Sequence, residues 1–197
     1  MKKTALFLDR DGIINQVAVY PDKVEKFDSP QNISDILIND QTIQIIKWAN
    51  DNHIPVIEAT NQPGYAKGKL SKNELDNIEK YIHQKLSEKG AVIDKTYICY
   101  HHPKGIIPRL SIECDCRKPK PGLLLNAAKE LNLDITNSIF LGDNATDVEA
   151  GIAAGCKTII YIHKSYYPDQ LHAAQNSHAD FKVTSLAKVL PILKNYF

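Results

Sequence analysis

The chain has 197 residues, of which 43% are hydrophobic and 24% charged, and its formal net charge is +1. These values indicate one soluble globular domain over residues 1–197, without the charge excess that binds nucleic acid or an anionic membrane. No apolar run approaches the ~20 residues of a membrane helix, and the basic start "MKKTALFLDRDG" reaches an acid too soon for a signal peptide. We therefore expect a cytoplasmic monomer with no nucleic-acid or membrane partner.

Short apolar runs alternate with helical patterns along the chain. The runs predict strands at 4–8, 55–59, 96–100, 138–142 and 158–162. Apolar residues at helical spacing predict helices at 40–50, 71–89, about 121–132 and 145–154. The tail predicts one more short strand and a helix interrupted by Pro191. Such alternation is typical of an α/β fold with a mostly parallel central sheet and helices on both faces.

Acidic and polar residues follow three of the predicted strands. In chain order they are Asp9 and Asp11, then Thr60 and Asn61, then Asp143 and Asp147. Because ligands bind at the carboxyl ends of the strands in open α/β sheets, we expect these side chains to converge at one edge. Clustered carboxylates are tolerated around a hard cation, and Mg²⁺ prefers a few protein oxygens together with water.

This acidic cluster suggests phosphoryl transfer. A carboxylate such as Asp9 beside Mg²⁺ can accept a phosphoryl group as an aspartyl phosphate, and Asp11 can protonate the leaving alkoxide and then deprotonate the attacking water. Each motif alone also fits a plainer role, since "DRDG" fits a solvated turn and Asp143 a helix cap. The coincidence of three strand ends favours the catalytic interpretation.

The stretch "CDCRKPKPG" supplies positive charge just before a predicted helix. Phosphoryl transfer requires fixed cations because its transition state is charged. Arg117 and Lys118 are expected to serve in this way, and Thr60 would add a hydroxyl aimed at phosphate oxygens. Lys120 fits a solvated surface charge better.

The segment 101–121 has four prolines and no periodicity, so something other than a hydrophobic core should hold it. Three thiols and an imidazole provide a closed tetrahedral set for a structural Zn²⁺ in a loop at about 99–116, namely Cys99, His101, Cys114 and Cys116. His102 is a rival imidazole, and buried free cysteines or a Cys99–Cys114 disulfide are the alternatives. Cys156, in an apolar run, is expected in the core.

With these motifs assembled, the chain resembles the haloacid dehalogenase (HAD) superfamily of Mg²⁺-dependent phosphatases. "FLDRDGIIN", "TNQPGYAKG", "CDCRKPKPG" and "GDNATD" are similar to the heptose-bisphosphate phosphatase family within it. The histidinol-phosphate phosphatases share the zinc loop and are the alternative, as is a phosphatase of another small phosphorylated sugar. The resemblance implies a Rossmann-like HAD fold without a large cap domain, so that the loop after Asn15 and the zinc loop would cover the substrate.

The resemblance also implies roles for individual residues. Asp9 would be the nucleophile and Asp11 the general acid and base, in a hydrolase that removes the 7-phosphate of a heptose bisphosphate in a lipopolysaccharide precursor pathway. Mg²⁺ would be bound by Asp9, the Asp11 backbone carbonyl and Asp143. Thr60 and Lys118 would hold the phosphate, Asn61 and Arg117 would orient the substrate, and Zn²⁺ would be bound by Cys99, His101, Cys114 and Cys116.

One departure from the family pattern and two other protein classes remain open at this stage. Asn144 stands where many of these phosphatases carry Lys, which leaves the sugar and its anomer undecided. A phosphoacceptor receiver domain also clusters acids at strand ends, but it needs no zinc loop. A zinc-organised nucleic-acid binder would present an extended basic face, whereas this chain is close to neutral.

Overall fold

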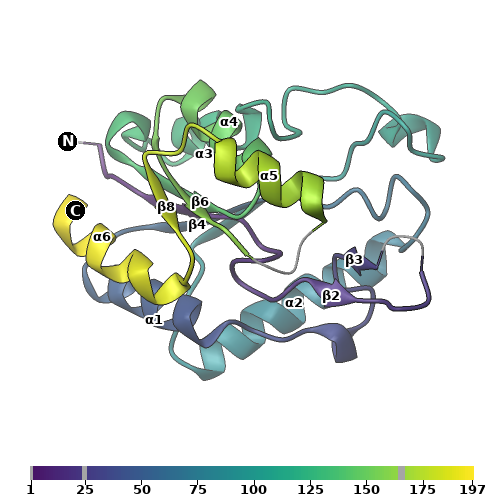
Figure 1. Cartoon of the computed structure of the whole chain (residues 1–197), viewed down its shortest axis with the longest axis horizontal. Helices are drawn as coiled ribbons and strands as arrows, with labels where there is room; N and C mark the ends of the chain where they lie inside the picture. Colours follow the sequence, from purple (N-terminus) through teal and green to yellow (C-terminus); the bar gives the residue numbers. More distant parts are fainter. Residues whose placement is uncertain (1, 24–25, 164–166) are drawn as a thin grey trace.

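The computed structural model describes residues 2–23, 26–163 and 167–197 and is built on one six-stranded sheet (Figure 1). All strand pairs in this sheet are parallel, and the spatial order is β5-β4-β1-β6-β7-β8. The strands are β1 (Leu6–Leu8), β4 (Val56–Asn61), β5 (Lys95–Cys99), β6 (Ile139–Gly142), β7 (Lys157–Tyr161) and β8 (Phe181–Val183). The first strand therefore lies in the middle of the sheet.

Helices cover both faces of the sheet (Figure 1). One face packs against α1 (Asp40–Asp51), α2 (Lys72–Glu88) and α6 (Val189–Tyr196). The other face packs against α3 (Gly122–Glu130) and α4 (Ala145–Ala154), and α5 (Pro168–Asn176) lies beside α4. This arrangement confirms the expected α/β class with helices on both faces.

The side chains of β1 show how the sheet divides the core. Leu6 and Leu8 point into the cluster that holds α1, α2 and α6, and Phe7 points into the cluster that holds α3 and α4. Successive side chains of a strand alternate between faces, so a central strand buried on both sides reads as a continuous apolar run. This pattern explains why "LFL" ends abruptly at Asp9, where the strand leaves the core.

The predicted elements are present with small shifts of their ends. The second predicted strand extends to Asn61, so Thr60 and Asn61 lie within β4. A capping box of Ser71 and Glu74 opens α2, close to the predicted start. The expected interruption at Pro191 does not occur, because Pro191 lies in the first turn of α6, where a helix needs no backbone donor.

Two small elements between β1 and α1, and one later helix, lie outside the predicted set. β2 (Ala18–Val19) and β3 (Phe27–Asp28) form an antiparallel pair, the β2–β3 hairpin, and α5 follows β7. Short 3-10 turns occur at Ile33–Asp35, Pro108–Leu110, Ile135–Asn137 and Leu186–Lys188. Within the described ranges no helix has the length and apolarity needed to cross a membrane.

Candidate active site

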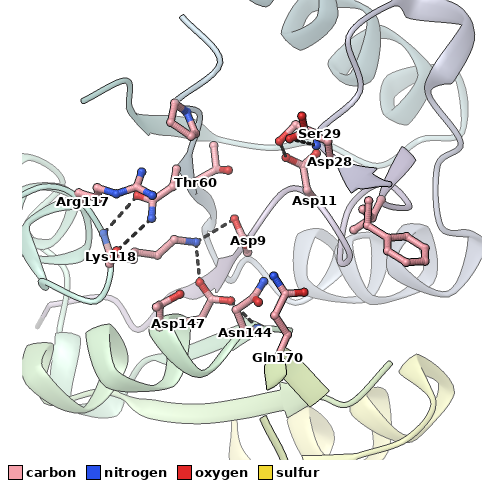
Figure 2. A pocket seen from close by; sticks show the side chains of 15 residues that line it. Asp9, Asp11, Asp28, Ser29, Thr60, Arg117, Lys118, Asn144, Asp147 and Gln170 are labelled. Carbon is pink, nitrogen blue, oxygen red and sulfur yellow. Dashed lines mark hydrogen bonds and ion pairs between the residues drawn. The ribbon is translucent and has the colours of Figure 1, made fainter. Parts of the chain in front are cut away.

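The carboxyl ends of β1, β4 and β6 open onto a cavity of about 270 Å³ (Figure 2). Asp9, Asp11, Thr60, Asn61, Arg117 and Lys118 all line it. The parallel sheet and the loop between β5 and α3 thus bring together every residue that was predicted for catalysis and phosphate binding. The β2–β3 hairpin contributes Phe27 and Asp28 to the wall, as expected for the loop after Asn15.

Lys118 is buried at the centre of this site. Its Nζ lies 2.8 Å from Asp9 Oδ1 and 2.7 Å from Asp147 Oδ1, and it donates a hydrogen bond to the Ala59 carbonyl at 2.9 Å. Burial alone would lower the pKa of Lys118, but the carboxylates of Asp147 and Asp9 raise it above its usual value. Lys118 therefore carries a positive charge at a fixed position.

The Asn61 side chain fastens the segment that carries this lysine. Its Nδ2 donates to the Lys118 carbonyl and its Oδ1 accepts from the Lys118 backbone N–H, both at 3.1 Å. Asn61 thus pairs with backbone, although it was expected to orient substrate. Arg117 extends along the cavity wall and donates through Nη1 to the His101 carbonyl at 3.3 Å.

The start of α4 places two more carboxylates next to Asp9. The Asp147 carboxylate accepts from the backbone N–H groups of Asp143 and Asn144 at 3.1 and 2.9 Å. A Cβ at Gly142 would lie 2.3 Å from the Cβ of Asp147, so only glycine permits this close approach. Asn144, at the N-terminal end of α4, donates to Asp143 Oδ1 at 2.8 Å.

The three carboxylates carry more negative charge than Lys118 balances. Asp9, Asp143 and Asp147 offer ligand atoms within 4.8 Å of one another. Burial is the main cause that raises the pKa of Asp9 to about 6, and burial together with Asp147 and Asp9 raises the pKa of Asp143 well above its usual value. A buried oxygen cluster in which Asp9 and Asp143 resist ionisation fits a hard divalent cation, which would favour the charged forms of these two acids.

Asp11 lines the same cavity, but its carboxylate points away from Asp9. In Figure 2 the Asp9 carboxylate points to Lys118, and that of Asp11 points to Ser29. Asp11 accepts from Ser29 Oγ at 2.7 Å, Gln62 Nε2 at 2.8 Å and Asn15 Nδ2 at 2.9 Å. Burial acts to raise the pKa of Asp11, but the Arg10 charge and these hydrogen bonds lower it overall.

Several residues around the cavity were not predicted from the sequence. Ser29 and Gln62 bind Asp11, and Gln170 of α5 lies beside Asn144 at the edge of the cavity (Figure 2). Gln62 belongs to the "TNQPG" stretch and was within reach of the motif analysis. Ser29 and Gln170 stand in segments without a recognisable pattern, so no signal pointed to them.

The cysteine cluster also forms as its spacing predicts. Cys99, His101, Cys114 and Cys116 offer ligand atoms within 4.8 Å of one another, and all four cysteines of the chain are free. The Sγ atoms of Cys99 and Cys114 are 3.7 Å apart, and Cys116 Sγ lies 3.3 Å from His101 Nδ1. Ligands about 2.3 Å from a tetrahedral Zn²⁺ are about 3.8 Å apart, and the contacting ligand atoms here are 3.2 to 3.8 Å apart, so this set is close to a zinc site. The backbone N–H of Lys104 donates to His102, which lies outside the cluster, and Cys156 is buried in the core.

Comparisons with known proteins agree with this geometry. The HAD-hydrolase-like family model matches residues 115–189. A D-glycero-alpha-D-manno-heptose-1,7-bisphosphate 7-phosphatase of Photorhabdus laumondii is 38% identical over 149 residues, which are 76% of each chain. The D-glycero-beta-D-manno-heptose-1,7-bisphosphate 7-phosphatase of Escherichia coli K12 is 31% identical over 192 residues, or 96% of this chain and 93% of that one.

A solved structure shares the fold over its whole length. The D,D-heptose 1,7-bisphosphate phosphatase from B. bronchiseptica, complexed with magnesium and phosphate, aligns with a TM-score of 0.78 at 26% identity and covers 99% of both chains. These relatives favour the heptose-bisphosphate family over the histidinol-phosphate alternative and exclude a receiver domain. The chain belongs to the heptose-1,7-bisphosphate 7-phosphatase family of the HAD-like hydrolases.

Proposed function

We propose that the protein is a phosphatase that removes the 7-phosphate of D-glycero-D-manno-heptose 1,7-bisphosphate, with Asp9 as nucleophile and Asp11 as general acid and base. The observation that carries this proposal is the convergence of Asp9, Asp11, Thr60, Arg117 and Lys118 on one cavity. The names of the relatives supply the substrate class.

Asp9 acts first in the proposed reaction. One oxygen of its carboxylate attacks phosphorus, and the bond between phosphorus and the sugar oxygen breaks. Asp11 enters this step protonated, the form that the negative charge of the bound phosphate favours, and gives its proton to that oxygen, so the sugar leaves as an alcohol and Asp11 becomes a carboxylate. Asp11 then takes a proton from water, whose oxygen attacks the phosphorus of the aspartyl phosphate. The Asp9 carboxylate and inorganic phosphate are the products.

Fixed charges of the chain would stabilise the transferring phosphoryl group. Lys118 is held by two carboxylates and a carbonyl and cannot swing away, so it supplies a preorganised cation. The Thr60 hydroxyl faces the cavity and already accepts from Gln62 Nε2 at 3.1 Å, which leaves its proton for a phosphate oxygen.

Metal ions complete the proposed site. Asp9, Asp143 and the Asp11 backbone carbonyl would hold Mg²⁺, which screens the charge between a carboxylate and a phosphate dianion. Cys99, His101, Cys114 and Cys116 would hold a structural Zn²⁺ that fixes the loop leading to Arg117 and Lys118. Both assignments rest on the chemistry of the donor sets.

The size of the cavity supports a small substrate. A volume of about 270 Å³ suits a sugar phosphate, with the exposed part of the Arg117 guanidinium available to the rest of the substrate. Its action as a monomer in the cytoplasm is part of the same proposal.

The direct test is Mg²⁺-dependent phosphate release from both anomers of the heptose bisphosphate, with histidinol phosphate and the Asp9→Asn variant for comparison. We expect release from a heptose anomer in wild type and none from the variant. Release from histidinol phosphate alone would contradict the proposed substrate.

A further inference from the structure

A group of buried and partly buried ionisable side chains lies behind Asp11, outside the cavity. It comprises Arg10, Glu58 on β4, and Glu79 and His83 on α2. Arg10 is 1% exposed and Glu58 is 0% exposed. The proposed reaction uses none of these side chains, so the burial of Arg10 and Glu58 beside the active site requires an explanation.

Arg10 binds the Asp11 carboxylate through two hydrogen bonds. Its Nε donates to Oδ1 and its Nη2 to Oδ2, both at 3.2 Å. This two-point contact fixes the plane of the carboxylate as well as its position, because both partners are planar and each supplies two atoms. Lysine, with a single ammonium group, does not provide the same constraint.

Glu79 anchors the other side of the Arg10 guanidinium. Arg10 Nη1 donates to Glu79 Oε2 at 3.3 Å, and Glu79 Oε1 lies 3.0 Å from His83 Nε2. The same ring nitrogen is 3.3 Å from Glu58 Oε2. A chain of contacts therefore runs from β4 through α2 to Arg10 and ends on Asp11.

Fold stability alone does not account for this arrangement. Burying paired charges costs desolvation free energy, and well-packed apolar residues of similar size stabilise a core as well or better. The core on this face of the sheet is otherwise apolar, including Val56 on β4 and Ile78 and Ile82 on α2. The charges end at a carboxylate that must be oriented for proton transfer, which gives them a role in the reaction.

We propose that Glu79 and Arg10 are positioning residues for Asp11: Glu79 anchors the guanidinium, and the guanidinium holds the Asp11 carboxylate at the cavity wall for proton transfer. This inference rests on the proposed function, because it assigns Asp11 the proton that the leaving oxygen receives.

The test compares two phosphate esters in the variant Glu79→Gln. A sugar alkoxide leaves poorly without a proton, whereas nitrophenolate leaves without one, so only the first depends on a well-placed Asp11. We expect kcat/KM for the heptose bisphosphate to fall about tenfold and kcat/KM for p-nitrophenyl phosphate to change less than about twofold. Glu88→Gln, an exposed site on the same helix that is paired with Lys85, is the matched control and should change neither.

A double variant separates positioning from a structural role. If Glu79 acts only through Asp11, Asp11→Asn/Glu79→Gln should be no slower than Asp11→Asn alone. Equal losses on both esters, or additive losses in the double variant, would overturn the proposal. If Glu79→Gln does not fold, Arg10→Lys carries the same test, because it keeps the charge and loses the two-point contact.

Failure of the proposed function would look different. Wild type that hydrolyses p-nitrophenyl phosphate but neither heptose anomer would overturn the substrate assignment. The inference would then be tested with aryl phosphates of graded leaving-group pKa. A steeper loss of kcat/KM with rising leaving-group pKa in Glu79→Gln supports it, and an unchanged slope overturns it.

Discussion

The carboxylate cluster and the cysteine cluster both gather metal-ligating side chains within 4.8 Å, but different parts of the fold hold them. Asp9 and Asp143 directly follow buried strands, and Asp147 lies in the first turn of α4. The cysteine cluster lies at the end of β5 and in a loop whose regular structure within 101–121 is one 3-10 turn. The fold thus positions the first cluster, whereas the proposed Zn²⁺ would position the loop that carries the second.

The largest expected effect is on activity, in the carboxylate cluster. Asp9→Asn should lower phosphate release by about 10⁴-fold or more, the scale of losing a nucleophile. Its melting temperature should stay within about 4 °C of wild type, because Lys118 keeps its contacts with Asp147 and Ala59 while one of three crowded carboxylates is neutralised. Phosphate assays and thermal melting test both statements. An active, folded variant would contradict the mechanism.

The second expected effect is on stability, in the cysteine cluster. Cys116→Ser should lose bound zinc and melt at least about 10 °C lower, because metal binding supplies a large share of the order in zinc loops. Zinc stoichiometry and thermal melting measure this. Cys156→Ser, which is outside the cluster, is the control and should keep its zinc. A Cys116→Ser protein that melts at the wild-type temperature would show that the cysteine cluster does not stabilise its loop through a metal ion.

A smaller effect on activity is expected at Arg117, which links the cysteine cluster to the cavity. Arg117 follows Cys116 directly and faces the cavity. Arg117→Ala should raise KM for the heptose bisphosphate about tenfold with little change in kcat, since it removes a charge-assisted hydrogen bond. Lys120→Ala is the control, because Lys120 is exposed and pairs with Asp115. Steady-state kinetics distinguish the variants, and equal KM values in both would show that Arg117 does not contact substrate.

The smallest expected effect concerns the ionisable group behind Asp11, which comprises Arg10, Glu58, Glu79 and His83. Bound protons and opposite charges balance one another in this group without a metal ion. Burial and the Glu79 charge raise the pKa of Glu58 to about 8, and hydrogen bonds to Glu58 and Glu79 raise the pKa of His83 to about 10. The folded state therefore holds these protons more tightly than the unfolded chain. This stabilisation is complete below the unfolded pKa values and is lost as pH rises through the folded ones.

Glu58→Gln keeps the shape of the protonated acid and removes its titration. As pH rises from about 5 to about 9, the free energy of unfolding should fall less in the variant than in wild type. Urea unfolding at both pH values measures the difference. Glu88→Gln, an exposed substitution, should follow wild type. A Glu58→Gln protein with the wild-type pH dependence would show that Glu58 is ionised in the folded state.

Much of the fold and of the candidate site was predictable because it depends on local patterns. β1, β4 and β6 are short apolar runs that end at acids or a hydroxyl, and parallel strands bring such ends together. The β2–β3 hairpin was not predictable, because strands of two residues show no alternation. α5 escaped for a similar reason, since Ala174 is its one fully buried residue.

Contacts between distant residues were beyond the reach of the sequence. Arg10, Glu79 and His83 meet only because α2 packs over the end of β1, and no spacing rule connects positions so far apart. Glu58 was a readable signal, as a charged residue inside the apolar run "PVIEA". A buried ionisable side chain of this kind indicates that a polar or charged partner lies elsewhere in the fold, but it does not identify that partner.

The β2–β3 hairpin makes substrate range a separable property of this enzyme. Its two strands pair with each other and belong to a sheet of their own, so the central sheet does not depend on them. The hairpin reaches the cavity through Phe27, Asp28 and Ser29, and Lys69 fastens it to the body by binding Asp28 at 2.7 Å. Exchange of residues 17–28, which leaves Ser29 bound to Asp11, is therefore a route by which selectivity can diversify while the reaction chemistry stays constant.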